Sequence, residues 1–227
     1  MLLCLQSTAV VAFGKIISCA YRSTRNLRKD VKKSLEEAYG TDTAEKIWKR
    51  GGELVETCPA KYPSIDYKKV GQYVFPLAAI YSAMLENGIG RDEAVSFLLT
   101  YGHRFGEKMR VLIHRLTGIP GVSALIWKNF DTIMHKTGGE ERGYKSDFFP
   151  VTETTAGLNV LQCPVYEAMK TMGVPEATPS ICAMDKVYMT GIRGIHYQRT
   201  MSVAEGDNYC DYRFVRIKGG SVSKAAR

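Results

Sequence analysis

Cys163, which directly precedes Pro164, is the residue best suited to nucleophilic chemistry by its type and position. Proline favours the first position of a helix, so Cys163 is expected at the helix cap. There its sulfur would face unpaired backbone N–H groups and the positive end of the helix dipole. This environment favours thiolate, the form in which cysteine acts as a nucleophile. The pattern therefore predicts a nucleophilic cysteine; the alternative is a small buried cysteine that only fills the cap.

Two further groups of residues have spacings that place side chains together. Cys182 and Asp185 are three residues apart, so on a helix they share a face. The carboxylate could hold an amidinium-like group, orient a base, or join Cys182 as a metal ligand. In a strand, alternation places Cys210, Tyr212 and Phe214 on one face. Core packing would explain this second pattern by itself.

Taken in order, these motifs resemble the L-2-amino-thiazoline-4-carboxylic acid hydrolase family. The resemblance is carried by Cys163-Pro164, Gly173-Val174-Pro175-Glu176, Cys182 with Asp185, Arg199-Thr200, Gly206-Asp207 and Cys210-Asp211-Tyr212-Arg213-Phe214. It runs from about Glu153 to Phe214, and Gly88 to Ala94 and Ile119-Pro120-Gly121 are also similar. It implies hydrolytic opening of a thiazoline ring to give N-carbamoyl cysteine. The positions that it singles out are Asn159, Cys163, Cys182, Asp185, Asp207, Cys210 and Asp211.

The implied substrate is a cyclic isothiourea, whose ring carbon between sulfur and nitrogen is electrophilic when protonated. We expect Cys163 to attack this carbon, with Cys182 nearby, while Asp185 pairs with the amidinium nitrogens. Asn159 and Asp207 are expected as further substrate contacts.

The substrate carboxylate needs a cation, and water needs a base. Arg199 and Arg213, on the expected hairpin, are candidates for the carboxylate by residue type. His196 suits proton transfer near neutral pH, although it could equally be a solvated strand residue. Glu153 is a further acid–base and substrate-binding candidate.

Two alternatives remain open at this stage. Cys163, Cys182, Cys210 and Asp185 could assemble a zinc site, although their separations show no metal-ligand spacing. The helical half with a small sheet is also similar to vinyl-reductase-type sensor domains, which would make the chain a ligand-binding or metal-binding module. The leading expectation is a hydrolase without cofactor or metal.

Composition agrees with a small-molecule enzyme in the cytoplasm. The chain has 227 residues, 45% of them hydrophobic, which is enough for a core without disulfides. Its six cysteines show no CxxC motif, and reduced thiols are expected. A net charge of +8 comes without any nucleic-acid-binding motif. Nucleic acid is therefore not expected as a partner.

The apolar stretch from Met1 to Ala20 is interrupted by Gln6, Gly14 and Lys15, so stable membrane insertion is not expected. A buried helix is the first expectation. The alternative is a helix at a membrane surface or in a homodimer, next to a basic run made of Arg22, Arg25, Arg28, Lys29, Lys32 and Lys33.

The elements that must position these residues change in pattern near residue 140. Apolar spacing predicts helices over 24–39, 42–48, 67–86, 92–116 and 122–135, with Pro59 in a loop and Pro76 kinking or splitting its helix. Alternation then predicts strands over 144–155, 194–203 and 209–217, the last two forming a hairpin, with helices over 164–172 and 176–188 between. We therefore expect one α+β domain: a mainly helical half (1–140), an α/β half (141–217) and a flexible tail (218–227).

Overall fold

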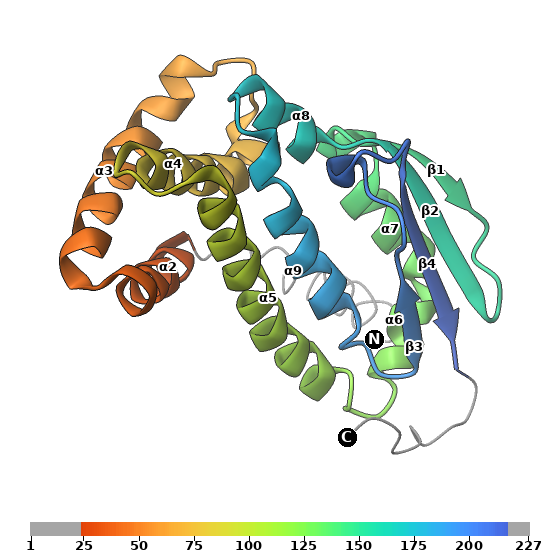
Figure 1. Cartoon of the computed structure of the whole chain (residues 1–227). Coiled ribbons are helices and arrows are strands. Elements are labelled where there is room, and N and C mark those ends of the chain that lie inside the picture. Colours follow the sequence, from red (N-terminus) through yellow and green to blue (C-terminus); the bar gives the residue numbers. More distant parts are fainter. Residues whose placement is uncertain (1–23, 218–227) are drawn as a thin grey trace.

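The computed structural model describes residues 24–217, and Figure 1 shows helices on one side of a small sheet. The first half contains α2 (Thr24–Tyr39), α3 (Thr41–Lys61), the π-helical turn η1 (Tyr67–Gly71), α4 (Gln72–Glu86), α5 (Arg91–Leu116), α6 (Val122–Lys128), α7 (Phe130–Gly138) and η2 (Glu140–Arg142). The second half contains β1 (Lys145–Phe149), β2 (Thr155–Gln162), α8 (Pro164–Thr171), η3 (Pro175–Ala177), α9 (Pro179–Met189), β3 (Ile195–Gln198), η4 (Val203–Glu205) and β4 (Cys210–Arg216). The expected α+β class is confirmed.

The four strands form one antiparallel sheet in the order β1-β2-β4-β3. The expected C-terminal hairpin is present, because β3 pairs with β4. In the centre of the sheet, Leu158 lies opposite Tyr212 and Val160 opposite Cys210. Because side chains alternate along a strand, these four residues and Phe214 point to the same face of the sheet. That face packs against the helices, and it forms one wall of the cavity described below.

Helix α9 joins the two halves of the molecule, because it lies between α5 on one side and the sheet on the other (Figure 1). Contact with α5 is close, because a Cβ atom on Gly102 would lie 2.3 Å from the carbonyl oxygen of Ser180. Ile181 belongs to the hydrophobic core of the helical half, whereas Met184 and Tyr188 belong to the core below the sheet. The partly buried Cys163 packs against both cores. The functional residues therefore lie where the two cores meet.

Several predicted boundaries were wrong in the helical half. Helix α3 continues through Pro59 to Lys61, because a proline in the last turn removes only one hydrogen bond. Pro76 lies inside helix α4 and does not end it. The irregularity lies one turn earlier, in the π-helical turn η1, because the proline ring clashes with the preceding turn of the helix. The predicted helix over 122–135 is two helices, which are separated at Asn129.

The predicted strand over 144–155 is present only in its first part. The structure has β1 up to Phe149, a loop that begins at Pro150, and then β2, which the alternation pattern did not reveal. Strand β2 contains Gly157 and Asn159, residue types that are depleted in strands. It forms a strand because it pairs with β1 on one side and β4 on the other.

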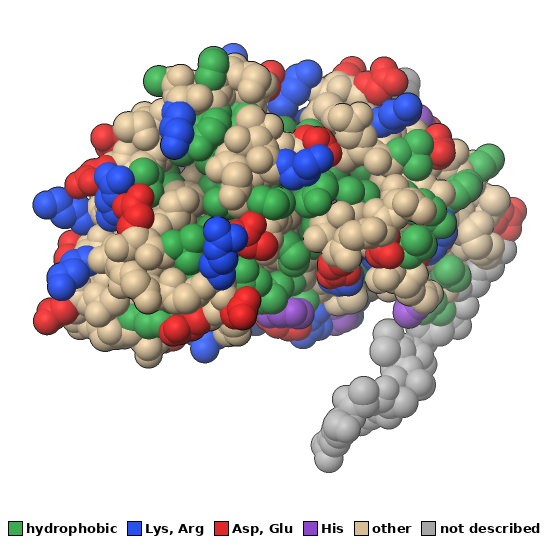
Figure 2. Space-filling model, turned by 45° about the horizontal axis from the view of Figure 1, so that its top comes forward, with side chains coloured by type: hydrophobic (Ala, Val, Ile, Leu, Met, Phe, Trp, Pro, Cys, Tyr) green, Lys and Arg blue, Asp and Glu red, His purple; other side chains and the backbone are tan. Residues whose placement is uncertain are grey.

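The face shown in Figure 2 carries charges of both signs. On this face, Lys and Arg side chains are interspersed with Asp and Glu. Lys32, from the basic run, forms an ion pair with Glu45 of α3, as expected for a solvated helix face. Within residues 24–217, no helix has the length and apolar character needed to cross a membrane. The segment over 1–20 and the tail over 218–227 lie outside the described residues.

Candidate active site

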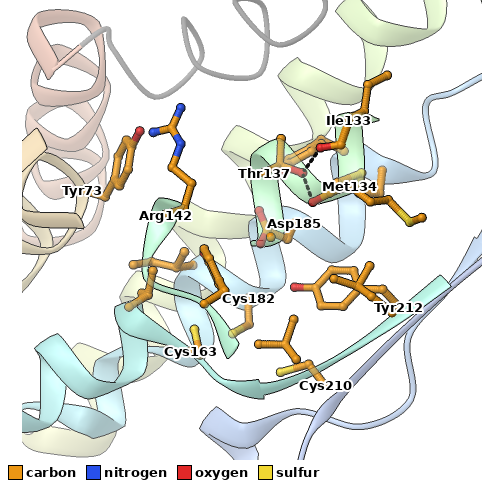
Figure 3. A pocket seen from close by; sticks show the side chains of 18 of the residues that line it. Tyr73, Ile133, Met134, Thr137, Arg142, Cys163, Cys182, Asp185, Cys210 and Tyr212 are labelled. Atoms are coloured by element: carbon orange, nitrogen blue, oxygen red, sulfur yellow. Dashed lines mark hydrogen bonds between the residues drawn. The ribbon is translucent and has the colours of Figure 1, made fainter. Parts of the chain in front are cut away.

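A cavity of about 190 Å³ lies between η1, α7, α9 and the inner face of the sheet, and Figure 3 shows it from close by. Its polar lining includes three thiols, one carboxylate and four tyrosines. The lining comprises Lys69, Val70, Tyr73, Phe130, Ile133, Met134, Thr137, Gly138, Arg142, Tyr144, Leu158, Val160, Cys163, Val165, Ile181, Cys182, Asp185, Tyr188, Met189, Ile192, Cys210, Tyr212 and Phe214. The three motifs singled out in the sequence therefore meet at one site.

Cys163 occupies the position that the sequence predicts, the N-cap of α8, with Pro164 at the first helical position. Burial among apolar groups raises the pKa of its thiol to about 12. The backbone N–H groups of Tyr166 and Val165 act in the opposite direction but do not outweigh burial. Burial therefore outweighs the helix cap, and the pKa of the Cys163 thiol is raised rather than lowered as the cap position alone predicts. The amides are in place to stabilise a thiolate once a nearby cation promotes its formation.

Cys182 and Asp185 line the cavity from the same face of α9, as their spacing predicts. Burial raises the pKa of the Cys182 thiol to about 11, although the positive charge of Arg199 lowers it. The pKa of Tyr188, one turn beyond Asp185, is raised well above its usual value by burial and by the charge and hydrogen bonding of Asp185. Asp185 therefore places a carboxyl group in a largely apolar cavity, within reach of a cationic ligand.

Cys210 and Tyr212 line the same cavity from β4. The Cys210 sulfur accepts a hydrogen bond from the backbone N–H of Val203 at 3.3 Å. The Tyr212 hydroxyl accepts one from Arg199 at 2.9 Å. Although the three thiols share the cavity, no three His, Cys, Asp or Glu side chains within residues 24–217 are grouped so that they could hold a metal ion.

A sequence model of the L-2-amino-thiazoline-4-carboxylic acid hydrolase family matches residues 67–214. The chain belongs to this family. The match covers more than half of the chain, and it contains every residue that lines the cavity, from Lys69 to Phe214. Among curated proteins, no match to the chain was found. Membership in this hydrolase family indicates hydrolase activity, and the family region includes the helical half from η1 onward as well as the motif block.

In this family member, several sequence candidates lie outside the cavity. Asn159 and Arg213 point to the opposite face of the sheet, where the guanidinium donates a 2.7 Å hydrogen bond to the Asn159 side chain and lies over the Phe149 ring. His196 is exposed on the same outer face, in β3. Strand alternation explains all of these placements, because Leu158, Tyr212 and Tyr197, their neighbours along the strands, point inward.

Three further candidates are also outside the lining of the cavity. Glu153 is exposed in the loop between β1 and β2. The Asp207 carboxylate accepts a hydrogen bond from the backbone N–H of Ser202 at 2.7 Å, which holds the hairpin loop. Arg199 is 7% exposed and bonds the Tyr212 hydroxyl and the Cys182 carbonyl. It supports the cavity wall from behind.

Sequence reasoning missed the cavity residues that come from the helical half and its border. Lys69 and Tyr73 lie on η1 and α4, one helical turn apart, and Arg142 ends η2. Burial raises the pKa of Tyr144 well above its usual value, as do the charges of the neighbouring thiols and of Asp185. Continuation of the Cys182–Asp185 spacing by one turn would have found Tyr188. No local pattern indicates Lys69 or Arg142, because each reaches the site only through tertiary packing.

Proposed function

We propose that this cavity hydrolyses a small cyclic isothiourea such as L-2-amino-thiazoline-4-carboxylate to N-carbamoyl-L-cysteine. The observation that carries the proposal is the arrangement of Cys163 and Asp185 in one cavity of a member of this hydrolase family. A cysteine at a helix N-terminus supplies a nucleophile, and a carboxylate supplies the counter-ion for a protonated amidine. The reaction needs only water as a second substrate.

The thiol of Cys163 is protonated at rest, so binding of the substrate must activate it. The protonated amidine brings a positive charge into the cavity, which lowers the pKa of a neighbouring thiol. Cys163 then passes its proton to Asp185, and the thiolate, held by the Val165 and Tyr166 amides, attacks the ring carbon. The bond from this carbon to the ring sulfur breaks. The leaving sulfur takes the proton from Asp185.

Water completes the reaction. It attacks the same carbon, now bonded to Cys163, and gives up a proton to Asp185. The bond to Cys163 breaks, the thiol is restored with that proton, and the carbon becomes the carbonyl of the urea product. The proton that the cationic substrate brought is released to solvent. In this scheme Asp185 performs the proton transfers that the sequence assigned to His196, since His196 is on the outer face of the sheet.

Lys69 and Arg142 are better placed than Arg199 and Arg213 to bind the substrate carboxylate. Both line the cavity, and both are reached from solvent, with Lys69 exposed and Arg142 half-buried. Neither takes part in an ion pair with another residue in the part of the chain that the structure describes. A cation that pairs with no described residue, at the mouth of a cavity, is available to a ligand anion.

The first experiment is incubation of the purified protein with L-2-amino-thiazoline-4-carboxylate, following N-carbamoyl cysteine by mass spectrometry. Cys163→Ser is compared with Cys58→Ala, since Cys58 is a buried cysteine of α3 outside the cavity. We expect product from the wild type and from the control, and none from Cys163→Ser. Equal product from Cys163→Ser would refute the nucleophile. No product from the wild type would refute the proposed substrate.

The carboxylate site is tested with Lys69→Ala and Arg142→Ala against Lys68→Ala. Lys68 is an exposed neighbour that does not line the cavity. Loss of a charge-assisted contact to the carboxylate should raise KM by about tenfold, on the order of 1.5 kcal/mol, with a smaller change in kcat. The same KM in all three variants would remove these cations from the substrate site.

A second candidate function is a non-catalytic module that binds a small ligand, as in vinyl-reductase-type domains. The observation in its favour is that burial keeps the Cys163 and Cys182 thiols protonated. The two functions are separated by trapping. Brief incubation with substrate followed by acid should leave an adduct of the amidine carbon on the Cys163 peptide if the chain is an enzyme, and an unmodified peptide if it only binds.

A further inference from the structure

The cavity has two chemically different ends. We call one the mouth, where Lys69, Tyr73 and Arg142 are exposed or half-buried beside Cys163. We call the other the deep end, which is formed by side chains that are almost fully buried and apolar: Phe130, Ile133, Met134, Ile192 and Phe214. In Figure 3, Tyr73 and Arg142 lie on one side, Met134 and Tyr212 on the other, and Asp185 between them.

Two elements that line the cavity run from the mouth to the deep end. Along β4, Cys210, Tyr212 and Phe214 line the cavity in turn, and the first and last are roughly 13 Å apart in a strand. Along α9, Cys182, Asp185 and Met189 line it in turn, over roughly 10 Å of helix. In both elements the chemistry changes in the same direction, from thiol to apolar.

Helix α7, which also lines the cavity, gives the same order. Thr137 and Gly138 lie towards the mouth, and Phe130 lies roughly 10 Å away along the helix axis. Phe130 meets Phe214 edge to face, with ring centroids 4.7 Å apart, and lies beside Trp127, with centroids 5.1 Å apart. These aromatic rings close the deep end. Three elements from separate parts of the chain therefore define one axis.

The bare substrate uses only part of this axis. A carboxylate at Lys69 and Arg142 and a ring carbon at Cys163 place its reacting groups at and just inside the mouth. The deep end offers such a polar molecule little, because polar groups lose hydrogen bonds with water when apolar side chains surround them. An engineered apolar cavity of about 150 Å³ binds benzene. The whole cavity here measures about 190 Å³ and also receives the reacting groups of the substrate, so a group in the deep end must be small.

We propose that the substrate of this chain is a 2-amino-thiazoline-4-carboxylate, or a related cyclic isothiourea, with a short alkyl or aryl group on its exocyclic nitrogen. This inference rests on the proposed function for the reacting end of the molecule. The exocyclic nitrogen is attached to the attacked carbon, across the ring from the carbon that carries the carboxylate. With the carboxylate at the mouth, a substituent on this nitrogen points along α9 towards Phe130 and Phe214. The product is a cysteine derivative whose terminal urea nitrogen carries the same group.

Binding tests the deep end without requiring turnover. Isothermal titration of Cys163→Ser with the unsubstituted, N-propyl and N-phenyl compounds gives three affinities. Each methylene buried should tighten binding by about fourfold, so the propyl compound should bind on the order of 60-fold more tightly than the unsubstituted one. Equal or weaker binding of the propyl and phenyl compounds would overturn the inference. If the substituted compounds bind tightly and the wild type hydrolyses none of the three, the deep end is supported and the proposed reaction fails.

Two variants locate the group within the cavity. Met134→Phe fills the deep end, and Phe130→Leu enlarges it, whereas both leave the residues of the mouth in place. The measured quantity is the ratio of phenyl to unsubstituted affinity within each variant, so a partly inactive preparation does not distort it. In the Cys163→Ser background, Met134→Phe should lower this ratio by at least about tenfold. Phe130→Leu should leave the ratio unchanged or raise it. An unchanged ratio in Met134→Phe would place the substituent elsewhere.

Discussion

Alkylation of Cys163 by iodoacetamide should be slow at neutral pH, because burial raises the pKa of its thiol from an ordinary value of 9.0 to about 12. A rise of three pH units leaves about 1000-fold less thiolate at pH 7. A more basic thiolate is intrinsically more nucleophilic, which recovers about 20- to 30-fold of this loss. The expected rate is therefore about 40-fold below that of the same cysteine in the unfolded chain, before any restriction on access to the cavity.

The rate is measured by quantifying the alkylated Cys163 peptide by mass spectrometry after timed quenching, in native protein and in protein unfolded with urea. The pH dependence separates ionisation from access. A thiol with a pKa near 12 gains about tenfold in rate with each pH unit between 7 and 10, whereas limited access scales all rates equally. Circular dichroism at each pH confirms that the chain stays folded. This control is needed because a thiol whose pKa is raised by folding contributes stability below pH 9 that is lost as the pH rises towards 12.

A rate profile that levels off at or below pH 9 would refute this reasoning. It would mean that the helix N-terminus outweighs burial, as the sequence alone suggested, and that Cys163 is activated before substrate binds. A rate in native protein equal to that in the unfolded chain at pH 7 would lead to the same conclusion.

Three predictions concern the frame around the site, each measured as a free energy of unfolding in urea. Gly102→Ala should destabilise the protein by roughly 2 kcal/mol, because the new Cβ atom would lie 2.3 Å from the Ser180 carbonyl oxygen. The control Gly52→Ala, whose Cβ atom would have nothing within 4 Å, should stabilise the protein by about 0.5–1 kcal/mol. Arg199→Met leaves the partly buried Tyr212 hydroxyl and Cys182 carbonyl without their donor and should cost roughly 2 kcal/mol. A loss under about 0.5 kcal/mol would show that the guanidinium does not support the wall. The pKa of Asp211 is lowered overall. Burial acts to raise this pKa, but the backbone and side-chain hydrogen bonds that the carboxylate accepts from the hairpin loop outweigh burial. Asp211→Asn should therefore destabilise the protein at pH 7, and its difference from wild type should shrink as the pH falls below about 4; a difference independent of pH would contradict this account.

The sequence alone was sufficient wherever the relevant interactions are local. Pro164 sets the start of α8 and so places Cys163 at its cap, because the preference of proline for the first helical turn acts between adjacent residues. The spacing of Cys182 and Asp185 put them on one face of α9 in the same way. Alternation along β4 placed Cys210, Tyr212 and Phe214 on the inner face of the sheet, since a strand has a period of two.

Tertiary structure decided the features that depend on distant segments. Arg213 and Asn159 were attractive by residue type, but packing of the sheet against α7 and α9 makes theirs the outer face. Lys69 and Arg142 are more than seventy residues apart, and only the packing of η1 against α8 and of η2 beside it brings them to one mouth. The pKa of Cys163 depends on the desolvation that every surrounding element imposes. A one-dimensional pattern records the type and spacing of residues, whereas their burial and their non-local neighbours exist only once the chain has folded.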